Sequence, residues 1–96
     1  MATYIFLGKL THQGITGIKD VRKRYDAAKQ LWESKGGKIL AAYATFGRYD
    51  YVFVVDLPSD EAALEVTVAT GSRGNVTFET CRAFAFEEFA KAAEKA

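Results

Sequence analysis

The pattern of hydrophobic and polar positions divides the first part of the chain into a strand, a turn and a helix. Residues 3–10 are dense in β-branched and aromatic side chains and run into a polar cluster that contains Gly14, which is typical of a strand followed by a turn. From Ile15 to Trp32 the apolar residues recur every three or four positions, as they do on one face of an amphipathic helix. Gly36 and Gly37 end this helix, because glycine adopts the left-handed conformation at little cost.

The middle of the chain predicts a β-hairpin and a second helix. Residues 38–46 and 51–57 are both of strand type, and the short polar segment 47–50 joins them. After Pro58, Ser59 is suited to cap a helix and two acidic residues follow it, so we predict a helix over 60–70. This segment contains several β-branched residues, and we expect the helix to depend on tertiary packing.

The last third of the chain predicts a loop over 71–74, a strand over 75–84 and a short helix over 86–95. Alternation in the strand places Phe78 and Arg82 on one face and Cys81 on the other. In the terminal helix, Phe86 and Phe89 are spaced to dock on the rest of the domain. The order of elements is βαββαβ with an added carboxy-terminal helix. It predicts one α+β domain, residues 1–96, of the ferredoxin-like type, with helices on one face of an antiparallel four-stranded sheet.

The strands of the predicted hairpin are apolar on both faces of the sheet. Tyr51, Phe53 and Val55 alternate with Val52 and Val54, whereas a strand with one solvated face carries polar residues at every second position. A large exposed apolar patch favours aggregation, and a two-fold interface covers it with a single self-complementary surface. We therefore predict a homodimer formed through the open sheet face, and the sequence leaves open whether dimers assemble further.

Composition excludes several classes of function. The chain has 13 basic and 12 acidic residues and a net charge of +1, far from the positive field that nucleic-acid binding needs. A single cysteine and a single histidine offer no metal-ligand cluster, and we expect neither a metal nor a cofactor. No apolar run approaches the roughly 20 residues that cross a bilayer, and the amino terminus lacks a signal-peptide pattern. We therefore expect a cytoplasmic protein without membrane contact.

Several segments resemble a known family. They are residues 4–11 with 13–15, the loop Gly47-Arg48-Tyr49-Asp50, and residues 74–76 with 80–84. Together they are similar to the GYD-domain family of small bacterial proteins over nearly the whole chain, with a Gly-x-Tyr-Asp form of the family tripeptide. The resemblance implies a dimeric α/β-barrel of ferredoxin-like subunits and no established function. Similar folds include small cofactor-independent monooxygenases, haem proteins and amino-acid-sensing domains, and a shared fold does not choose among them.

Seven polar residues are candidates for ligand binding, because we expect them near strand ends around a pocket between sheet and helices. They are His12, Arg24, Tyr43, Arg48, Tyr49, Asp50 and Arg82. For His12 a solvated turn residue is favoured over a general base. For Asp50 we favour capping of the Gly47 or Arg48 amides over ligand binding. Arg24 belongs to a basic run, residues 22–24, of which we expect one side chain to turn toward the sheet edge.

Arg82 is the most informative of the seven, because the strand pattern predicts that it lies on a buried face. A buried guanidinium needs a partner, since burying an unpaired charge is very costly. The partner is a carboxylate of the same chain, a carboxylate across the dimer interface or an anionic ligand, and we favour the first.

The sequence supports three functional hypotheses. The first is a dimeric domain that binds or senses a small molecule in a pocket between the sheet and the helices. The alternatives are a small enzyme similar to the cofactor-independent monooxygenases and a protein-interaction module without a ligand. The sequence does not decide whether the protein is an enzyme, although the lack of a Ser-His-Asp or paired-carboxylate pattern gives hydrolytic catalysis little support.

Overall fold

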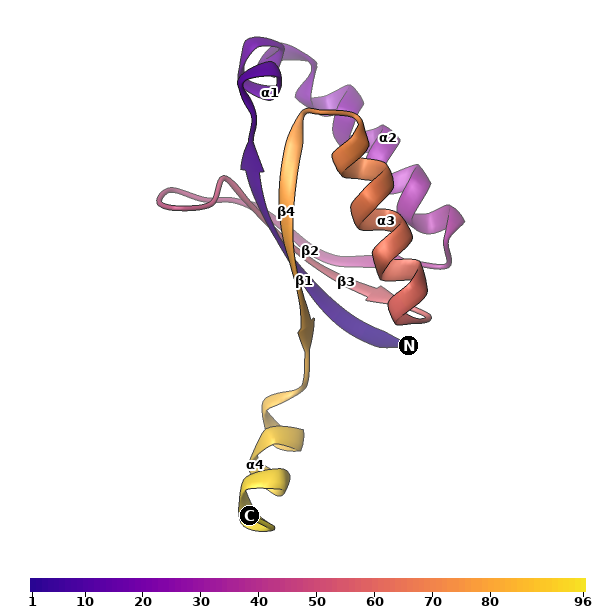
Figure 1. Cartoon of the computed structure of the whole chain (residues 1–96), viewed down its shortest axis with the longest axis vertical. Helices are drawn as coiled ribbons and strands as arrows, with labels where there is room; N and C mark the ends of the chain where they lie inside the picture. The colour runs from indigo at the N-terminus through magenta and orange to yellow at the C-terminus, as the bar shows by residue number, and fades with distance from the viewer.

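The computed structural model describes residues 1–96 and contains one four-stranded antiparallel sheet with helices on one face (Figure 1). The strands are β1 (Ala2–Leu10), β2 (Lys38–Ala44), β3 (Tyr51–Leu57) and β4 (Val76–Ala83). Their order across the sheet is β2-β3-β1-β4, and each neighbouring pair is antiparallel. This arrangement confirms the predicted α+β, ferredoxin-like fold.

The helices are α1 (His12–Thr16), α2 (Val21–Ser34), α3 (Asp60–Ser72) and α4 (Phe86–Glu94), with a 3₁₀ turn at Ile18–Asp20. The prediction of one continuous helix from Ile15 to Trp32 was wrong. The Gly17 amide donates to Gln13 and closes α1, and the Gly17 carbonyl accepts from Asp20 in the tighter 3₁₀ turn. Helix α3 continues past its predicted end into the expected loop. The second strand stops short of its predicted end, at Ala44.

The core lies between the sheet and the two long helices, α2 and α3. Phe6 of β1 and Trp32 of α2 are almost fully buried, at 0% and 1% exposed, and their rings stack with centroids 5.0 Å apart. Phe78 of β4 meets Phe6 edge-on at 5.5 Å. These aromatic side chains bury large apolar areas and pack in the preferred offset and edge-to-face geometries. They fix α2 over the sheet.

The register of the sheet shows which side chains form its outer face. Ile5 and Leu7 of β1 pair with Val54 and Val52 of β3, on the side opposite Phe6 and the helices. The hairpin strands are therefore apolar on both faces, as the sequence predicted. The outer face is not uniformly apolar along its length, because Asp56 and other polar side chains share it near the strand ends.

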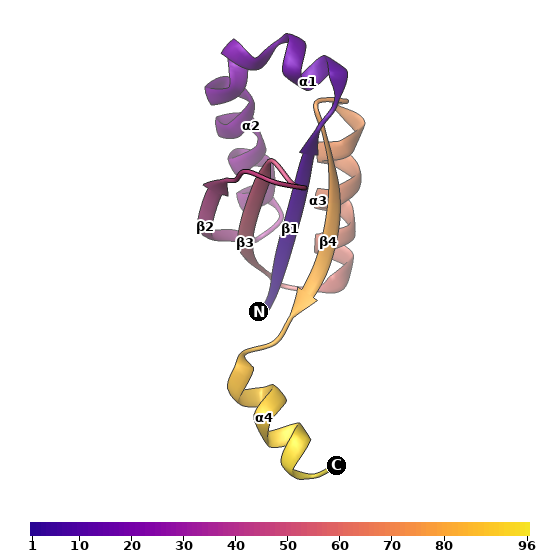
Figure 2. The same cartoon turned by 90° about the vertical axis from the view of Figure 1, so that its left-hand side faces the viewer.

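Helix α4 leaves the domain beyond the end of β4 and projects away from the sheet and the other helices (Figures 1 and 2). Phe86 and Phe89 contact each other at 5.8 Å between ring centroids, yet they are 79% and 64% exposed. The expectation that these phenylalanines dock on their own domain was wrong, because the extended linker at Phe84 and Ala85 directs the helix outward. None of the helices combines the length and hydrophobicity of a membrane-spanning segment.

Candidate functional site

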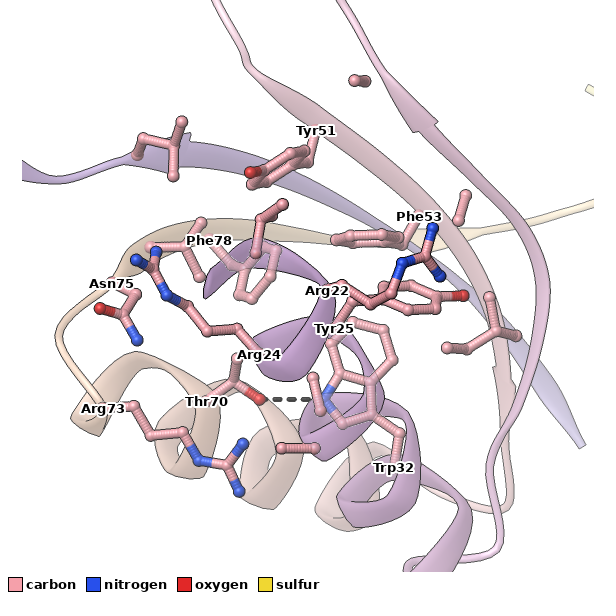
Figure 3. Close-up of a pocket in the computed structure, with 18 of the residues that line it drawn as sticks. Arg22, Arg24, Tyr25, Trp32, Tyr51, Phe53, Thr70, Arg73, Asn75 and Phe78 are labelled. Carbon is pink, nitrogen blue, oxygen red and sulfur yellow. Dashed lines mark hydrogen bonds between the residues drawn. The ribbon is translucent and has the colours of Figure 1, made fainter. Parts of the chain in front are cut away.

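A pocket of about 770 Å³ lies between α2 and the helix-covered face of the sheet (Figure 3). It is found where β1 ends and β4 begins, so its wall includes Leu10, Asn75 and Val76. Helix α2 and strands β2 and β3 supply most of the rest, and Thr70 and Arg73 come from the end of α3. Of the 20 residues that line the pocket, 14 are hydrophobic. This volume is within the range of sites that hold small organic molecules.

Aromatic rings from the sheet and from α2 gather around Phe53 at the pocket wall. The Phe53 centroid lies 5.4 Å from Trp32, 6.0 Å from Phe78 and 6.2 Å from Tyr25. Tyr51, two residues earlier in β3, lies 5.8 Å from Phe53. Alternation along β3 and β4 directs Tyr51, Phe53 and Phe78 to the helix-covered face of the sheet, and Trp32 and Tyr25 meet them from α2. The result is a flat-sided apolar surface suited to contact with another ring or a hydrocarbon.

Trp32 also ties the two long helices together at the pocket wall. Its indole Nε1 donates a hydrogen bond of 2.9 Å to the Thr70 hydroxyl of α3, and both groups are buried. Figure 3 shows this bond as the dashed line at the base of the site. A buried indole N–H without a partner destabilises the fold. This bond therefore stabilises both the position of the Trp32 ring in the pocket wall and the packing of α2 on α3.

Four basic residues line the pocket, namely Arg22, Lys23, Arg24 and Arg73, and no acidic residue does. The Arg24 guanidinium donates to the carbonyl of Gly14 at 2.9 Å and to that of Gly17. These bonds satisfy the carbonyls at the end of α1 and hold the side chain in place. No carboxylate lies within ion-pair distance of Arg24, since the chain's single side-chain ion pair joins Lys35 and Glu65 at 3.8 Å.

Tyr51 places a phenol at the pocket wall near Arg24. Burial raises the pKa of Tyr51, the positive charge of Arg24 opposes that rise, and the Asp50 carboxylate adds to it. The net shift is upward, so the phenol remains protonated at neutral pH and is available as a hydrogen-bond donor.

The structure brings two of the seven predicted ligand-binding residues, Arg24 and Tyr43, to this pocket. His12 is an exposed residue at the start of α1 and does not line it. Arg48 and Tyr49 stack on each other, with the guanidinium carbon 5.8 Å from the ring centre. They are absent from the wall because their loop, between β2 and β3, projects on the side of the sheet opposite the helices (Figure 1).

Asp50 has a structural role, although not the predicted one of capping the turn amides. Its carboxylate accepts a 2.8 Å hydrogen bond from the backbone N–H of Leu10, and its own N–H donates to the Gly8 carbonyl at 2.8 Å. The side chain therefore joins the start of β3 to the end of β1. The glycine of the turn, Gly47, has a φ of +98°, a conformation that other residues adopt rarely.

Arg82 lies at the opposite end of the sheet from the pocket, and the prediction that it is buried was wrong. The residue is exposed. Its guanidinium stacks over Phe84 at 4.4 Å and Tyr4 at 5.6 Å, and it donates to the Ala83 carbonyl. No carboxylate lies within ion-pair distance of Arg82. Its long side chain covers apolar rings with its stem and keeps its charge in water, so the charge needs no such partner. Arg82 lines a separate depression of about 290 Å³ that also includes Asp60.

Sequence reasoning missed most of the pocket wall, including Trp32, Phe53, Thr70 and Arg73. Alternation placed Phe53 on one face with Tyr51 and Val55 but did not indicate which face the helices cover. For the basic run 22–24 the sequence predicted that one side chain turns toward the sheet edge, whereas all three residues line the pocket. Only the helix break at Gly17, which the periodicity did not reveal, explains how Arg24 reaches back to α1.

Two comparisons with known proteins bear on this chain. A family model described as GYD domain matches residues 4–93, from β1 to α4. A protein of Thermus thermophilus named "Glutamine synthetase and cystathionine beta-lyase binding protein" is 31% identical over 84 residues. The alignment covers 86% of this chain and 88% of that protein.

Proposed function

This chain belongs to the GYD domain family, and we propose that it binds a small organic molecule in the pocket between α2 and the sheet. The observation that carries the proposal is the pocket itself, about 770 Å³ with an aromatic wall. A cavity of this size with a few polar groups among apolar ones is the usual form of a small-molecule site. Arg24 and Tyr43 remain candidate ligand-binding residues, and Arg22, Tyr51 and Arg73 join them.

A substitution at Ala42 tests the proposal. Ala42 is on β2 beside Phe53, lines the pocket and is exposed, so a phenylalanine there occupies the cavity without removing a core contact. A thermal-shift screen of small molecules on the parent protein supplies ligands that raise the melting temperature. We expect Ala42→Phe to abolish these shifts and Ala42→Ser, which keeps the cavity, to retain them. Hits that stabilise both variants equally bind elsewhere, and a screen with no hit counts against the proposal.

The enzyme alternative receives less support from the geometry. Histidine is the side chain that acts most often as a general acid or base, and His12, the chain's one histidine, lies outside the pocket wall. Turnover of a ligand found in the screen by the parent protein, and its loss in His12→Gln, would favour an enzyme over a binding protein.

We also propose that the protein forms a homodimer through the outer face of the sheet. The apolar pairs of Ile5 with Val54 and Leu7 with Val52 support it, because a second copy presents the same surface to this one. Sedimentation velocity at micromolar concentration gives the test. We expect Val54→Lys to produce a monomer and Gln30→Lys, at an exposed position of α2 on the other side of the sheet, to leave the dimer intact. A parent protein that sediments as a monomer contradicts the proposal.

A second candidate function is binding to another protein. It is supported by the relative of Thermus thermophilus, whose name describes binding to glutamine synthetase and cystathionine beta-lyase. Titration calorimetry of this protein with each of those two enzymes tests whether the property extends to this chain. Heat of binding with a saturable stoichiometry supports the candidate, and the absence of binding at tens of micromolar removes it.

A further inference from the structure

We infer that the pocket takes an organic anion, a molecule with a flat apolar body and a negatively charged group such as a carboxylate. This inference rests on the proposed function, because it names the class of ligand for the same pocket. It has three supports in the structure, which are the sign of the charges around the pocket, the fixed position of Arg24 and the aromatic wall.

The charges around the pocket are of one sign, although the chain as a whole is almost neutral. Four basic residues and no acidic residue line it, whereas the full sequence has 13 basic and 12 acidic residues. The excess is therefore local and does not reflect composition. A concave apolar surface with one sign of charge concentrates the field and attracts ligands of the opposite charge.

Arg24 is held ready for a ligand and is not neutralised by the protein. Its two hydrogen bonds go to uncharged carbonyls, those of Gly14 and Gly17, and a guanidinium has five N–H donors. The side chain is already ordered, so an anion that binds it loses less conformational entropy. The nearby carboxylate of Asp50 does not line the pocket, and it accepts a hydrogen bond from the Leu10 amide.

The aromatic wall determines the body of the ligand. Phe53 and Tyr25 present tilted rings 6.2 Å apart, and Phe53 and Phe78 meet edge to face at 6.0 Å. Rings in such arrangements accept another flat apolar group. Tyr51 adds a protonated phenol on the same wall, close enough to Arg24 for the charge of Arg24 to affect its titration. A ligand with its ring on Phe53 therefore finds cationic and hydrogen-bond donors around the same cavity (Figure 3).

Three probes with one ring system and different charges test the inference. They are 2-naphthoate, 2-naphthamide and 2-naphthylmethylammonium, and titration calorimetry measures the affinity of each. A hydrogen bond to a charged group contributes about 1.5–3 kcal/mol, which corresponds to roughly ten- to a hundredfold in affinity. We therefore expect naphthoate to bind about ten- to a hundredfold more tightly than naphthamide, and the ammonium to bind most weakly. Added salt weakens naphthoate binding and leaves naphthamide binding nearly unchanged.

Charge-removing variants locate the anion. Arg24→Gln removes the ordered guanidinium but also loosens the end of α1. A double variant, Arg22→Gln with Arg73→Gln, instead removes two exposed guanidinium groups that form no hydrogen bond or ion pair within the fold. Lys29→Gln is the matched control, because Lys29 is an exposed cation of α2 that does not line the pocket. We expect at least a tenfold loss of naphthoate affinity in Arg24→Gln or in the double variant, and no loss in Lys29→Gln.

The outcomes separate the inference from the function on which it rests. Naphthamide binding as tightly as naphthoate, with loss of both in Ala42→Phe, overturns the anion inference and leaves the small-molecule proposal standing. Equal losses in Lys29→Gln and in the pocket variants also overturn it, because they show a response to net charge alone. If none of the three probes binds and the screen described above finds no ligand, the proposed function and the inference both fail.

Discussion

Replacement of Thr70 by valine isolates the hydrogen bond that joins α2 to α3 at the pocket wall. The Thr70 hydroxyl is the acceptor for the indole N–H of Trp32, at 2.9 Å, and the two side chains are 5% and 1% exposed. Valine has nearly the same size and shape as threonine, so the substitution leaves no cavity. It leaves a buried N–H donor without a partner, because no other acceptor for it is present.

The expected cost follows from this geometry. A buried polar group that loses its partner destabilises the fold by about 1–3 kcal/mol. In a domain of this size, 1 kcal/mol lowers the melting temperature by roughly 4–8 °C. Thr70→Val should therefore lower the melting temperature by about 4–24 °C and the free energy of unfolding in urea by the same 1–3 kcal/mol.

Urea unfolding followed by circular dichroism measures this effect in every variant, and the fluorescence of Trp32, the chain's one tryptophan, reports it in those that retain this residue. Thr77→Val is the control, because Thr77 is exposed on β4 and its replacement strands no buried donor. In a Trp32→Phe background the donor is gone, and Thr70→Val should cost less there than in the parent. A loss in Thr70→Val no larger than that in Thr77→Val, or an equal loss in both backgrounds, would refute the reasoning.

Two further predictions concern the start of α1 and the other end of the sheet. A Cβ at Gly14 would lie 2.0 Å from the Asn75 carbonyl oxygen, whereas nothing lies within 4 Å of a Cβ at Gly71. Gly14→Ala should therefore lower the free energy of unfolding by about 1–3 kcal/mol. Equal stability of Gly14→Ala and Gly71→Ala in urea would contradict this. The pKa of Tyr4 is raised by its hydrogen bond to Asp60, by burial and by the charge of Asp60, and the charge of Arg82 opposes this rise. The protonated phenol therefore stabilises the fold fully below pH 10, and this contribution is lost as pH rises above 10. Unfolding in urea from pH 8 to 11 should show a smaller loss of stability for Tyr4→Phe than for the parent, and equal losses would show that Tyr4 does not contribute.

Local pattern was enough to predict the order of the strands and helices and which strand residues share a face. Residues 51–57 alternate, so Phe53 and Val55 had to lie opposite Val52 and Val54 whatever covered them. A repeat of two in a strand or 3.6 in a helix is a property of the backbone alone, and this is why the fold class was predictable. The resemblance to the GYD-domain family, carried by short motifs along the chain, is confirmed by the family match over residues 4–93.

The pocket, in contrast, depends on contacts between segments far apart in the sequence. Arg24 of α2 and Arg73, which directly follows α3, line the same cavity, yet nothing in either segment indicates the other. The break at Gly17 turns Arg24 toward the carbonyls of α1, and a helical repeat that continues across the break gives no sign of it.

Burial of a polar residue was decided only by what packs against its side of the sheet. Arg82 and Phe78 share a face of β4, but Phe78 lies under the helices while Arg82 stacks on Phe84 and reaches solvent. Phe86 and Phe89 likewise have the spacing of a docking helix and remain exposed, because α4 points away from the domain. The sequence by itself determined the elements and their faces, through backbone periodicity. Tertiary structure alone decided which of those faces are covered, since that depends on the direction of each connection and the reach of the neighbouring elements.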